Sequence, residues 1–265
     1  MSTALDSAHA LAVARDAAVA AGEILLRFLG RLEGTRIDAK SSARDLVTEA
    51  DVSSERLLVE RLRAAFPDHA IEAEEEVRDA ERAGPRWFLD PLDGTINFIH
   101  GIPAFAVSMG LYVDGEPEVA VVHAPRLGET FTARRGHGAH LNGTAIAVSE
   151  TTSLGDAILG TGFPYRRNEL EHDNLANFGR FFYDVRGLRR IGSAALDLAY
   201  VAAGRLDGFW ELHLSPHDVA GGALLVREAG GVVTDARGGD DWLRGGRIVA
   251  SGPVLHESIR ERVVG

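Results

Sequence analysis

The chain of 265 residues is 45% hydrophobic and 25% charged, which is the composition of a folded globular protein and argues against disorder. Its net charge of −11 argues against direct nucleic-acid binding, because phosphate backbones are bound by basic surfaces. It contains no cysteine, which excludes disulfides and thiolate metal sites. Residues 1–21 lack the basic start and apolar run of a signal peptide, and no stretch is long enough to cross a membrane. We therefore expect a cytoplasmic protein.

The N-terminal half, taken as residues 1–150, opens with helical patterns. Residues 4–30 carry apolar side chains at helical spacing and predict one amphipathic helix that ends near Gly30. A short strand is expected at 36–40, and a second helix is expected to begin at Thr48. This order, helices before strands, favours an α+β arrangement for the first half.

Asp51 follows Thr48 at the spacing of a capping box, in which each residue holds the start of the helix. Capping alone is therefore one interpretation of this carboxylate. The other is that Asp51 reaches the turn at Asp93–Thr95 and orients the hydroxyl of Thr95. The residues by themselves leave both interpretations open.

The remainder of the first half predicts a largely antiparallel sheet, because strand-like segments alternate with tight-turn signals. The turn signals are Asp114-Gly115 and Asn142-Gly143. The strands are expected around Ile71 and at 87–89, 104–113, 119–123, 130–134 and 139–141.

An acidic turn, Asp90-Pro-Leu-Asp-Gly-Thr95, follows the apolar run at 87–89, where Pro91 and Gly94 are expected to end the strand. Asp90 and Asp93 would repel each other at close range unless a cation lay between them. Hard divalent metals such as Mg²⁺ are the natural cation for oxygen ligands. A helix that begins near Thr95 would point free N–H groups at an anion in the same place. Metal plus anion at a strand end is phosphatase chemistry, although Asp, Pro and Gly are also common in ordinary β-turns.

A second acidic run, Glu72–Glu76, follows the short strand around Ile71. Charged runs are usually solvated faces. Its position ahead of the acidic turn favours a metal-ligand role for at least one of its glutamates.

The C-terminal half, taken as residues 151–265, alternates strands with helices and predicts a layered α/β unit. Strands are expected at 157–161, 183–186, 206–211, 232–234 and 247–251. Helices are expected at 170–181, 192–203, 218–228 and 254–263.

Three places in this half are candidates for ligand contact. Gly192-Ser-Ala-Ala-Leu-Asp197 begins a helix with small residues, which permits either close approach to a ligand or tight helix packing. Glu211 ends a strand after Trp210. Asp218 starts a helix, where it is either an N-terminal cap or a metal ligand.

These segments, taken in order, resemble the inositol monophosphatase family of Mg²⁺-dependent, lithium-sensitive phosphatases. The resemblance runs almost from end to end. It is carried by Lys40-Ser-Ser, Asp45-Leu-Val-Thr48, Asp51, Ala73-Glu-Glu75, Asp90-Pro-Leu-Asp-Gly-Thr-Ile-Asn-Phe98, Gly162-Phe-Pro-Tyr165, Gly192–Asp197, Trp210-Glu211, Asp218-Val-Ala-Gly-Gly222 and Glu228-Ala-Gly-Gly231.

The resemblance implies a role for each matching residue. The metal ligands would be Glu74, Asp90, Asp93 and the Leu92 carbonyl, with Asp218 joining Asp90 and Asp93 on a second metal. Two or three Mg²⁺ ions would be bound. Thr95 and Glu74 would hold or activate the attacking water, with Asp51 supporting Thr95. The substrate contacts would come from Lys40, Asp93, Gly94, Thr95, Ser193, Ala194 and Glu211.

The family's fold is a layered αβαβα sandwich, usually a homodimer. The implied reaction is hydrolysis of a phosphate monoester of a small polyol, most simply inositol monophosphate. Fructose-1,6-bisphosphate, histidinol phosphate and nucleotide 3′-phosphates are alternative substrates within the family. A regulatory protein-binding member with secondary phosphatase activity is a further alternative, because some relatives are thought to act on RNA-linked machinery.

The chain departs from the family pattern at two positions. Ala73 stands where glycine usually precedes the paired glutamates. His217 stands where tryptophan usually precedes the last ligand, Asp218, so we expect His217 to steady this corner by a hydrogen bond instead of by bulk.

Overall fold

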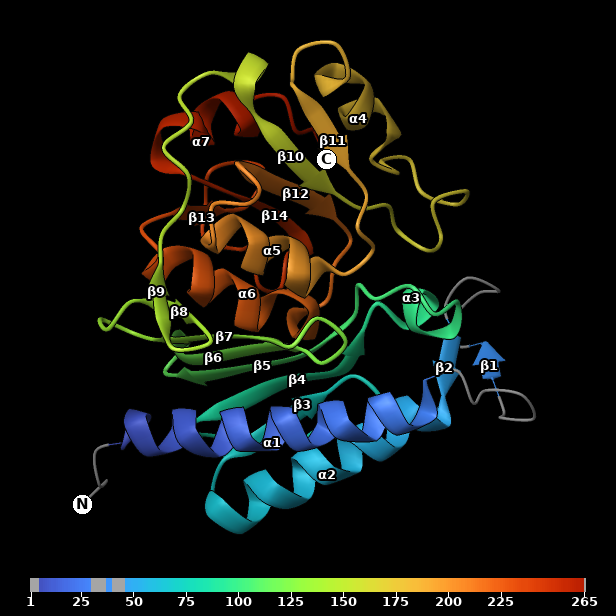
Figure 1. Cartoon of the computed structure of the whole chain (residues 1–265), viewed down its shortest axis with the longest axis vertical. Helices are drawn as coiled ribbons and strands as arrows, with labels where there is room; N and C mark the ends of the chain where they lie inside the picture. The colour runs from blue at the N-terminus through green and yellow to red at the C-terminus, as the bar shows by residue number, and fades with distance from the viewer. Residues whose placement is uncertain (1–4, 30–36, 40–45, 265) are drawn as a thin grey trace.

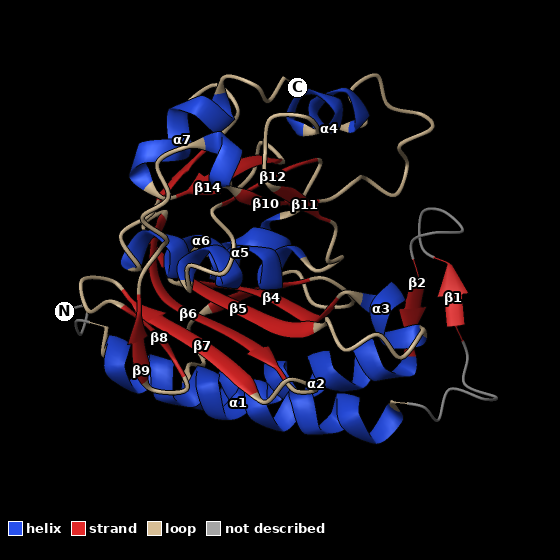
Figure 2. Cartoon of the chain, turned by 45° about the horizontal axis from the view of Figure 1, so that its top comes forward, coloured by secondary structure: helices blue, strands red, loops and turns tan. Residues whose placement is uncertain are grey.

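The computed structural model describes residues 5–29, 37–39 and 46–264 as five stacked layers of helices and strands (Figure 1). The helices are α1 (Ser7–Phe28), α2 (Glu49–Ala65), α3 (Thr95–Ile99), α4 (Leu175–Phe181), α5 (Ala194–Ala202), α6 (Pro216–Glu228) and α7 (Pro253–Arg260). Helices α1 and α2 form one outer layer, α5 and α6 the middle layer, and α4 and α7 the other outer layer (Figures 1 and 2). This αβαβα sandwich confirms the expected architecture.

The larger sheet has the order β3-β4-β5-β6-β7-β8-β9 and is antiparallel except for the pair β3 and β4. Its strands are β3 (Ala70–Ala73), β4 (Arg86–Asp93), β5 (Ala106–Val113), β6 (Glu116–Ala124), β7 (Glu129–Arg134), β8 (Ala139–Leu141) and β9 (Thr144–Ile146). The two predicted turns have positive φ at both central residues, which matches the twist of neighbouring strands. A separate pair, β1 (Ile37–Ala39) and β2 (Leu46–Thr48), is antiparallel.

Strand β4 differs from the prediction, because it continues through Pro91 to Asp93. Its register on β5 shifts between Asp90, which pairs with Ser108, and Asp93, which pairs with Ala106. A bulge leaves residues out of the hydrogen-bond ladder, so a proline without an N–H fits there. The acidic turn is therefore a bulged strand end.

The smaller sheet has the order β11-β10-β12-β14-β13 and is mixed. Its strands are β10 (Ile158–Thr161), β11 (Gly187–Arg189), β12 (Gly208–Leu212), β13 (Val232–Thr234) and β14 (Arg247–Ser251). Strand β10 is parallel to β11 and β12, whereas β14 is antiparallel to both β12 and β13.

Two predictions for the segment before β11 were wrong. Residues 170–174 are not helical, because Asn174 has a φ of 74° and its side-chain amide donates to the Gly162 carbonyl 2.6 Å away. Residues 183–186 form a turn and not a strand, since Asp184 and Val185 both donate to the Phe181 carbonyl at the end of α4.

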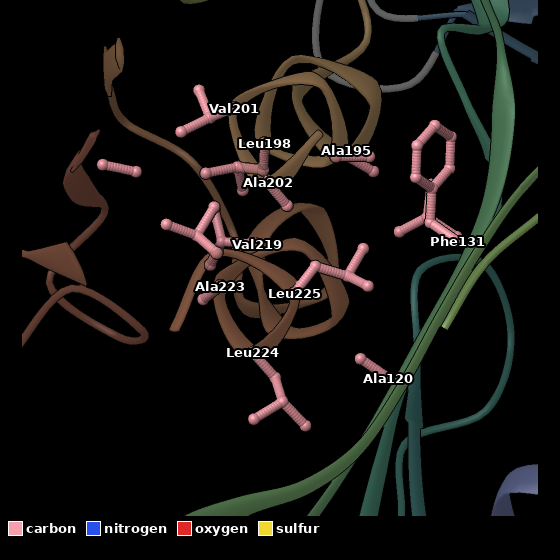
Figure 3. Packing of buried hydrophobic residues seen from close by; sticks show 14 of the residues in the cluster. Ala120, Phe131, Ala195, Leu198, Val201, Ala202, Val219, Ala223, Leu224 and Leu225 are labelled. Carbon is pink, nitrogen blue, oxygen red and sulfur yellow. The ribbon is translucent and has the colours of Figure 1, made fainter. Parts of the chain in front are cut away.

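The core lies in the interfaces between layers. Helix α1 places small side chains against the larger sheet, with Ala10, Ala14 and Ala17 fully buried. On the opposite face of this sheet, Phe131 and Ala120 face the paired helices α5 and α6 (Figure 3). Burial of these apolar surfaces is the main favourable term in folding.

The chain passes from the larger to the smaller sheet between Ile146 and Ile158. Helices α5 and α6 belong to the second half but share one apolar cluster with strands of both sheets. The division at 1–150 and 151–265 stays a prediction. Among the described helices, none has the length and apolar character needed to span a bilayer.

Helix α6 approaches β5 closely enough that only glycine fits at the contact. A Cβ added to Gly110 would lie 2.8 Å from the backbone carbon of Ala220, and one added to Gly221 would lie 2.9 Å from the Met109 carbonyl oxygen. Side chains on either residue would force the helix away from the sheet. This contact sets the position of the start of α6.

Gly110→Ala is expected to destabilise the protein by about 1–3 kcal/mol, because the added methyl group overlaps backbone that cannot rotate away. Urea unfolding measures the change. Gly179→Ala is the matched control: it lies in α4 with open space around its Cβ position, and alanine favours helix by about 0.5–1 kcal/mol over glycine. Equal unfolding midpoints for Gly110→Ala and the wild type would contradict the close contact.

Candidate active site

Three carboxylates meet where the bulged end of β4 faces the start of α6. Asp90, Asp93 and Asp218 each offer one oxygen, and these oxygens all lie within 4.8 Å of one another. Asp90 and Asp93 are 1% and 8% exposed, and Asp218 is partly buried. These acids are up to 128 residues apart in the sequence, and the fold brings them together.

Backbone N–H groups fix one oxygen of Asp90 and one of Asp218. The amide of Leu92 donates to Asp90 Oδ1 at 2.9 Å, within the bulge. The amide of Ser215 donates to Asp218 Oδ2 at 2.6 Å, at the start of α6. The N-cap of α6 is Ser215 and not Asp218; Asp218 is the third helical residue of the capping box and is also a member of the cluster.

Asp93 is fixed from the opposite half of the molecule. The hydroxyl of Ser193 and the amide of Ala195 both donate to Asp93 Oδ2, at 2.6 and 2.7 Å. Ser193 also caps α5, where its oxygen accepts from the Leu196 amide at 3.3 Å. The start of α5 thus holds a cluster carboxylate, a function that the small residues of this segment did not reveal in the sequence.

The carboxylates strain one another electrostatically. Burial, followed by the charges of Glu74, Asp93 and Asp218, raises the pKa of Asp90 well above its usual range. Burial and Asp218 raise the pKa of Asp93 to about 7, although its hydrogen bonds from Ser193 and Ala195 oppose the shift. A hard cation would relieve this repulsion, and an all-oxygen donor set of this kind fits such a metal.

Thr95 links the cluster to α2. Its hydroxyl lies 3.2 Å from Asp51 Oδ1 and 3.1 Å from the Leu92 carbonyl oxygen. Asp51 Oδ2 accepts from the Thr48 amide at 2.8 Å, which completes the capping box of α2. Asp51 therefore holds the start of α2 through Oδ2 and contacts the Thr95 hydroxyl through Oδ1.

The cluster opens into a cavity of about 370 Å³. Predicted site residues that line it are Glu74, Asp93, Ser193, Ala194, Glu211 and Asp218. Gly94, the αL residue before α3, and Thr95 lie at the adjoining strand end. Lys40 falls outside the described residues.

Glu211 lines this cavity and is 8% exposed, and a Cβ on Gly162 would overlap its carboxylate. Burial raises the pKa of Glu211 to about 8, although the positive charge of Arg190 lowers it. Behind it, Asp197 is 1% exposed, and burial and Glu211 raise its pKa well above the usual range. Asp197 Oδ1 has no hydrogen-bond partner among the described residues.

Arg78, Tyr165 and Arg190 also line the cavity and were not predicted as site residues. Tyr165 stands in a segment quoted for the resemblance, so that motif was a usable signal. Arg78 lies in a charged run and Arg190 in Arg189-Arg190, where nothing in the pattern separates them from solvated arginines. Only their placement around the cavity identifies them.

The two departures from the family pattern have different outcomes. Ala73 is buried at the end of β3, where the additional methyl group is accommodated. His217 lines the cavity, but its Nε2 lies 4.0 Å from Asp218 Oδ1. That separation is too long for a hydrogen bond, so His217 does not hold Asp218 in the expected way.

The αβαβα sandwich thus carries, at a strand end beside a polar cavity, a cluster of carboxylates that could hold a metal. The model of the inositol monophosphatase family matches residues 6–264. The chain is 49% identical to Nus factor SuhB of Pseudomonas aeruginosa, over 91% of this chain and 90% of that protein. It is 44% identical to an inositol-1-monophosphatase of Rhizobium meliloti, over 91% of each chain.

Among solved structures, the extragenic suppressor protein suhB of Bartonella henselae matches with a TM-score of 0.90 and 40% identity. The match covers 96% of this chain and 98% of that one. The chain belongs to the inositol monophosphatase family.

The metal-free protein is expected to lose stability as the pH rises. Folding raises the pKa of these acids. At a pH between the unfolded-state and the folded-state pKa, the folded protein therefore binds more protons than the unfolded chain. The free energy of unfolding then falls as the pH rises across that range. For Asp93 the window runs from 3.8 to about 7, and for Glu211 from 4.5 to about 8. Urea unfolding in EDTA between about pH 5.5 and 8.5 measures the loss.

Adding Mg²⁺ is expected to reverse this trend, because a bound cation favours the ionised carboxylates. Asp93→Asn is the matched variant, because it preserves volume and an acceptor oxygen while removing one charge. Its metal-free form is expected to be more stable than the wild type near pH 8. Metal-free stability that is flat or rises across this range would contradict the electrostatic account.

Proposed function

We propose that this protein is a Mg²⁺-dependent phosphatase that hydrolyses a phosphate monoester of a small polyol. The observation that carries the proposal is the cluster of Asp90, Asp93 and Asp218, of which Asp93 and Asp218 line an open polar cavity. Family membership supports the reaction class, and the similarity to an inositol-1-monophosphatase of Rhizobium meliloti supports inositol monophosphate as the substrate to test first.

Mg²⁺ would be held by Glu74, Asp90, Asp93, the Leu92 carbonyl and Asp218, and when bound it would neutralise the substrate phosphate and lower the pKa of water. Asp90, Asp93 and Asp218 are each fixed through one oxygen by a backbone amide, so their geometry is set before any ligand arrives. Such preorganisation avoids a reorganisation cost during the reaction.

Thr95 and Glu74 would position the attacking water. The single hydrogen of the Thr95 hydroxyl can be donated to Asp51 Oδ1 or to the Leu92 carbonyl, and in either case its lone pairs would remain available to water. The amides of Gly94 and Thr95 would donate to the phosphate, while Ser193, Ala194 and Glu211 would contact the alcohol. Burial raises the pKa of Glu211 in the metal-free protein, and a bound cation would oppose this shift by favouring the ionised carboxylate.

The wider assignments also belong to this proposal. We expect the enzyme to act as a homodimer in the cytoplasm. Fructose-1,6-bisphosphate, histidinol phosphate and nucleotide 3′-phosphates remain alternative substrates at the same site. A second function, binding of a protein partner, is favoured by one observation: the 49% identical relative from Pseudomonas aeruginosa is named as a Nus factor.

Removal of metal is expected to abolish phosphate release from inositol 1-phosphate, and Li⁺ is expected to inhibit it. Asp93→Asn and Asp218→Asn should each lower kcat by about 10²-fold or more while the fold is retained, because they remove charge and preserve volume. Phosphate release with and without Mg²⁺ measures the effect, and circular dichroism checks the fold. Full activity after exhaustive chelation with EDTA would rule the proposal out.

Thr95→Ala is expected to lower kcat by about 10²-fold if the hydroxyl positions water. Thr95→Ser is the matched control, because it keeps the hydroxyl that contacts Asp51 and should keep most activity. Steady-state kinetics and thermal unfolding are measured on both variants. A lower melting temperature with unchanged kcat would assign Thr95 a structural role alone.

A further inference from the structure

A basic cluster lies directly beside the catalytic cavity. Arg78, Arg86 and Arg244 line a second cavity of about 330 Å³ together with Glu72. Arg78 lines both cavities, so the two adjoin at this side chain. Three arginines and one glutamate give the cluster a net charge of +2 (3 − 1), in a chain whose net charge is −11.

Glu72 and the ring of Phe88 fix two of the three arginines. Arg244 donates to both oxygens of Glu72, at 3.4 and 3.1 Å, and its guanidinium lies 5.4 Å from the centre of the Phe88 ring. Arg86 Nη1 is 3.5 Å from the same Glu72 oxygen and donates to the Asp79 carbonyl, while its Nη2 donates to the carbonyls of Ala80 and Arg82, so both terminal nitrogens of Arg86 already have partners. One carboxylate therefore serves two guanidinium groups, which leaves positive charge uncompensated.

Arg78 is differently placed. Its backbone pairs with Glu72 in an isolated bridge, so its Cα is fixed relative to β3. Its guanidinium donates to the Glu74 carbonyl at 3.3 Å and is exposed. No carboxylate lies within 4.0 Å of it in the part of the chain that the structure describes. Arg86 and Arg244 have a structural role, because their contacts with Glu72 join β4 and the loop at 240–246 to β3. That role does not account for Arg78.

We propose that Arg78, in the positive field of Arg86 and Arg244, binds a second anionic group of the substrate, a phosphate or carboxylate, while the scissile phosphate occupies the adjoining catalytic cavity. This inference rests on the proposed phosphatase function and narrows its substrate class to polyols with two anionic groups. Guanidinium groups suit such oxyanions because they donate two parallel hydrogen bonds. A local positive field also offsets the repulsion of an anion by the acidic chain.

The anion site is tested first without catalysis. In EDTA-treated full-length protein the catalytic acids repel phosphate, so inorganic phosphate reports on the basic cluster. Titration calorimetry is expected to show binding by the wild type and at least about 10-fold weaker binding by Arg78→Gln, the loss of one bidentate contact. Arg186→Gln, an exposed arginine paired with Asp156 away from the cavity, removes the same charge and should bind as the wild type. Equal binding by Arg78→Gln and Arg186→Gln would overturn the proposal.

The substrate assignment is tested with Mg²⁺ present. We expect Arg78→Gln to lower kcat/KM for inositol 1,4-bisphosphate or fructose 1,6-bisphosphate about 10-fold more than it lowers kcat/KM for inositol 1-phosphate, so that the preference among these substrates changes. A similar loss for all three substrates would overturn the assignment. Loss of phosphate binding without any change in this preference would assign the cluster to a free anion and overturn it equally. If the wild type hydrolyses none of these substrates, the phosphatase proposal fails separately, and the calorimetry alone decides whether the anion site exists.

Discussion

The arrangement of this structure depends on one constraint: three carboxylates of like charge are held close together within the protein. Asp90 and Asp93 are almost fully buried and share a small volume with Asp218, an arrangement that raises the pKa of Asp90 and Asp93 and works against folding. Such a cluster persists only where the surrounding fold holds each group in place. The anchoring hydrogen bonds come from the β4 bulge, from α5 and from α6.

The middle helical layer provides two of these three anchors. Helices α5 and α6 share an apolar cluster with strands of both sheets, so their N-termini are positioned by packing on two sides. The glycine contact between Gly110 and Ala220 brings α6 onto β5, close to Ser108, which pairs with Asp90. Burial of apolar surface in the middle of the sandwich thus offsets the electrostatic cost at its edge.

The surroundings of the cluster divide into two electrostatic regions. Glu211 and Asp197 add further buried acids on the side of α5 and β12, where burial raises the pKa of both. Arg78, Arg86 and Arg244 line the adjoining second cavity, next to β3 and β4. Under the two proposals, the acidic region would select substrates through contacts with their hydroxyl groups, and the basic cluster would select them by charge. The hydrolysis itself would follow the chemistry of the family.

The sequence alone determined the elements whose signals are local. The periodicity of α1, the Thr48–Asp51 capping box and the paired turn residues at Asp114 and Asn142 depend on neighbours only a few residues away, and the structure agrees with each. The ordered acidic motifs likewise predicted the cluster of Asp90, Asp93 and Asp218.

Tertiary structure decided the rest. Pro91 remains within β4 because a bulge relieves its missing N–H, and Asn174 delays α4 because its side chain is held by Gly162. Arg78 became a site residue only when folding placed it between two cavities, since a charged run in a sequence does not show which of its members face a ligand.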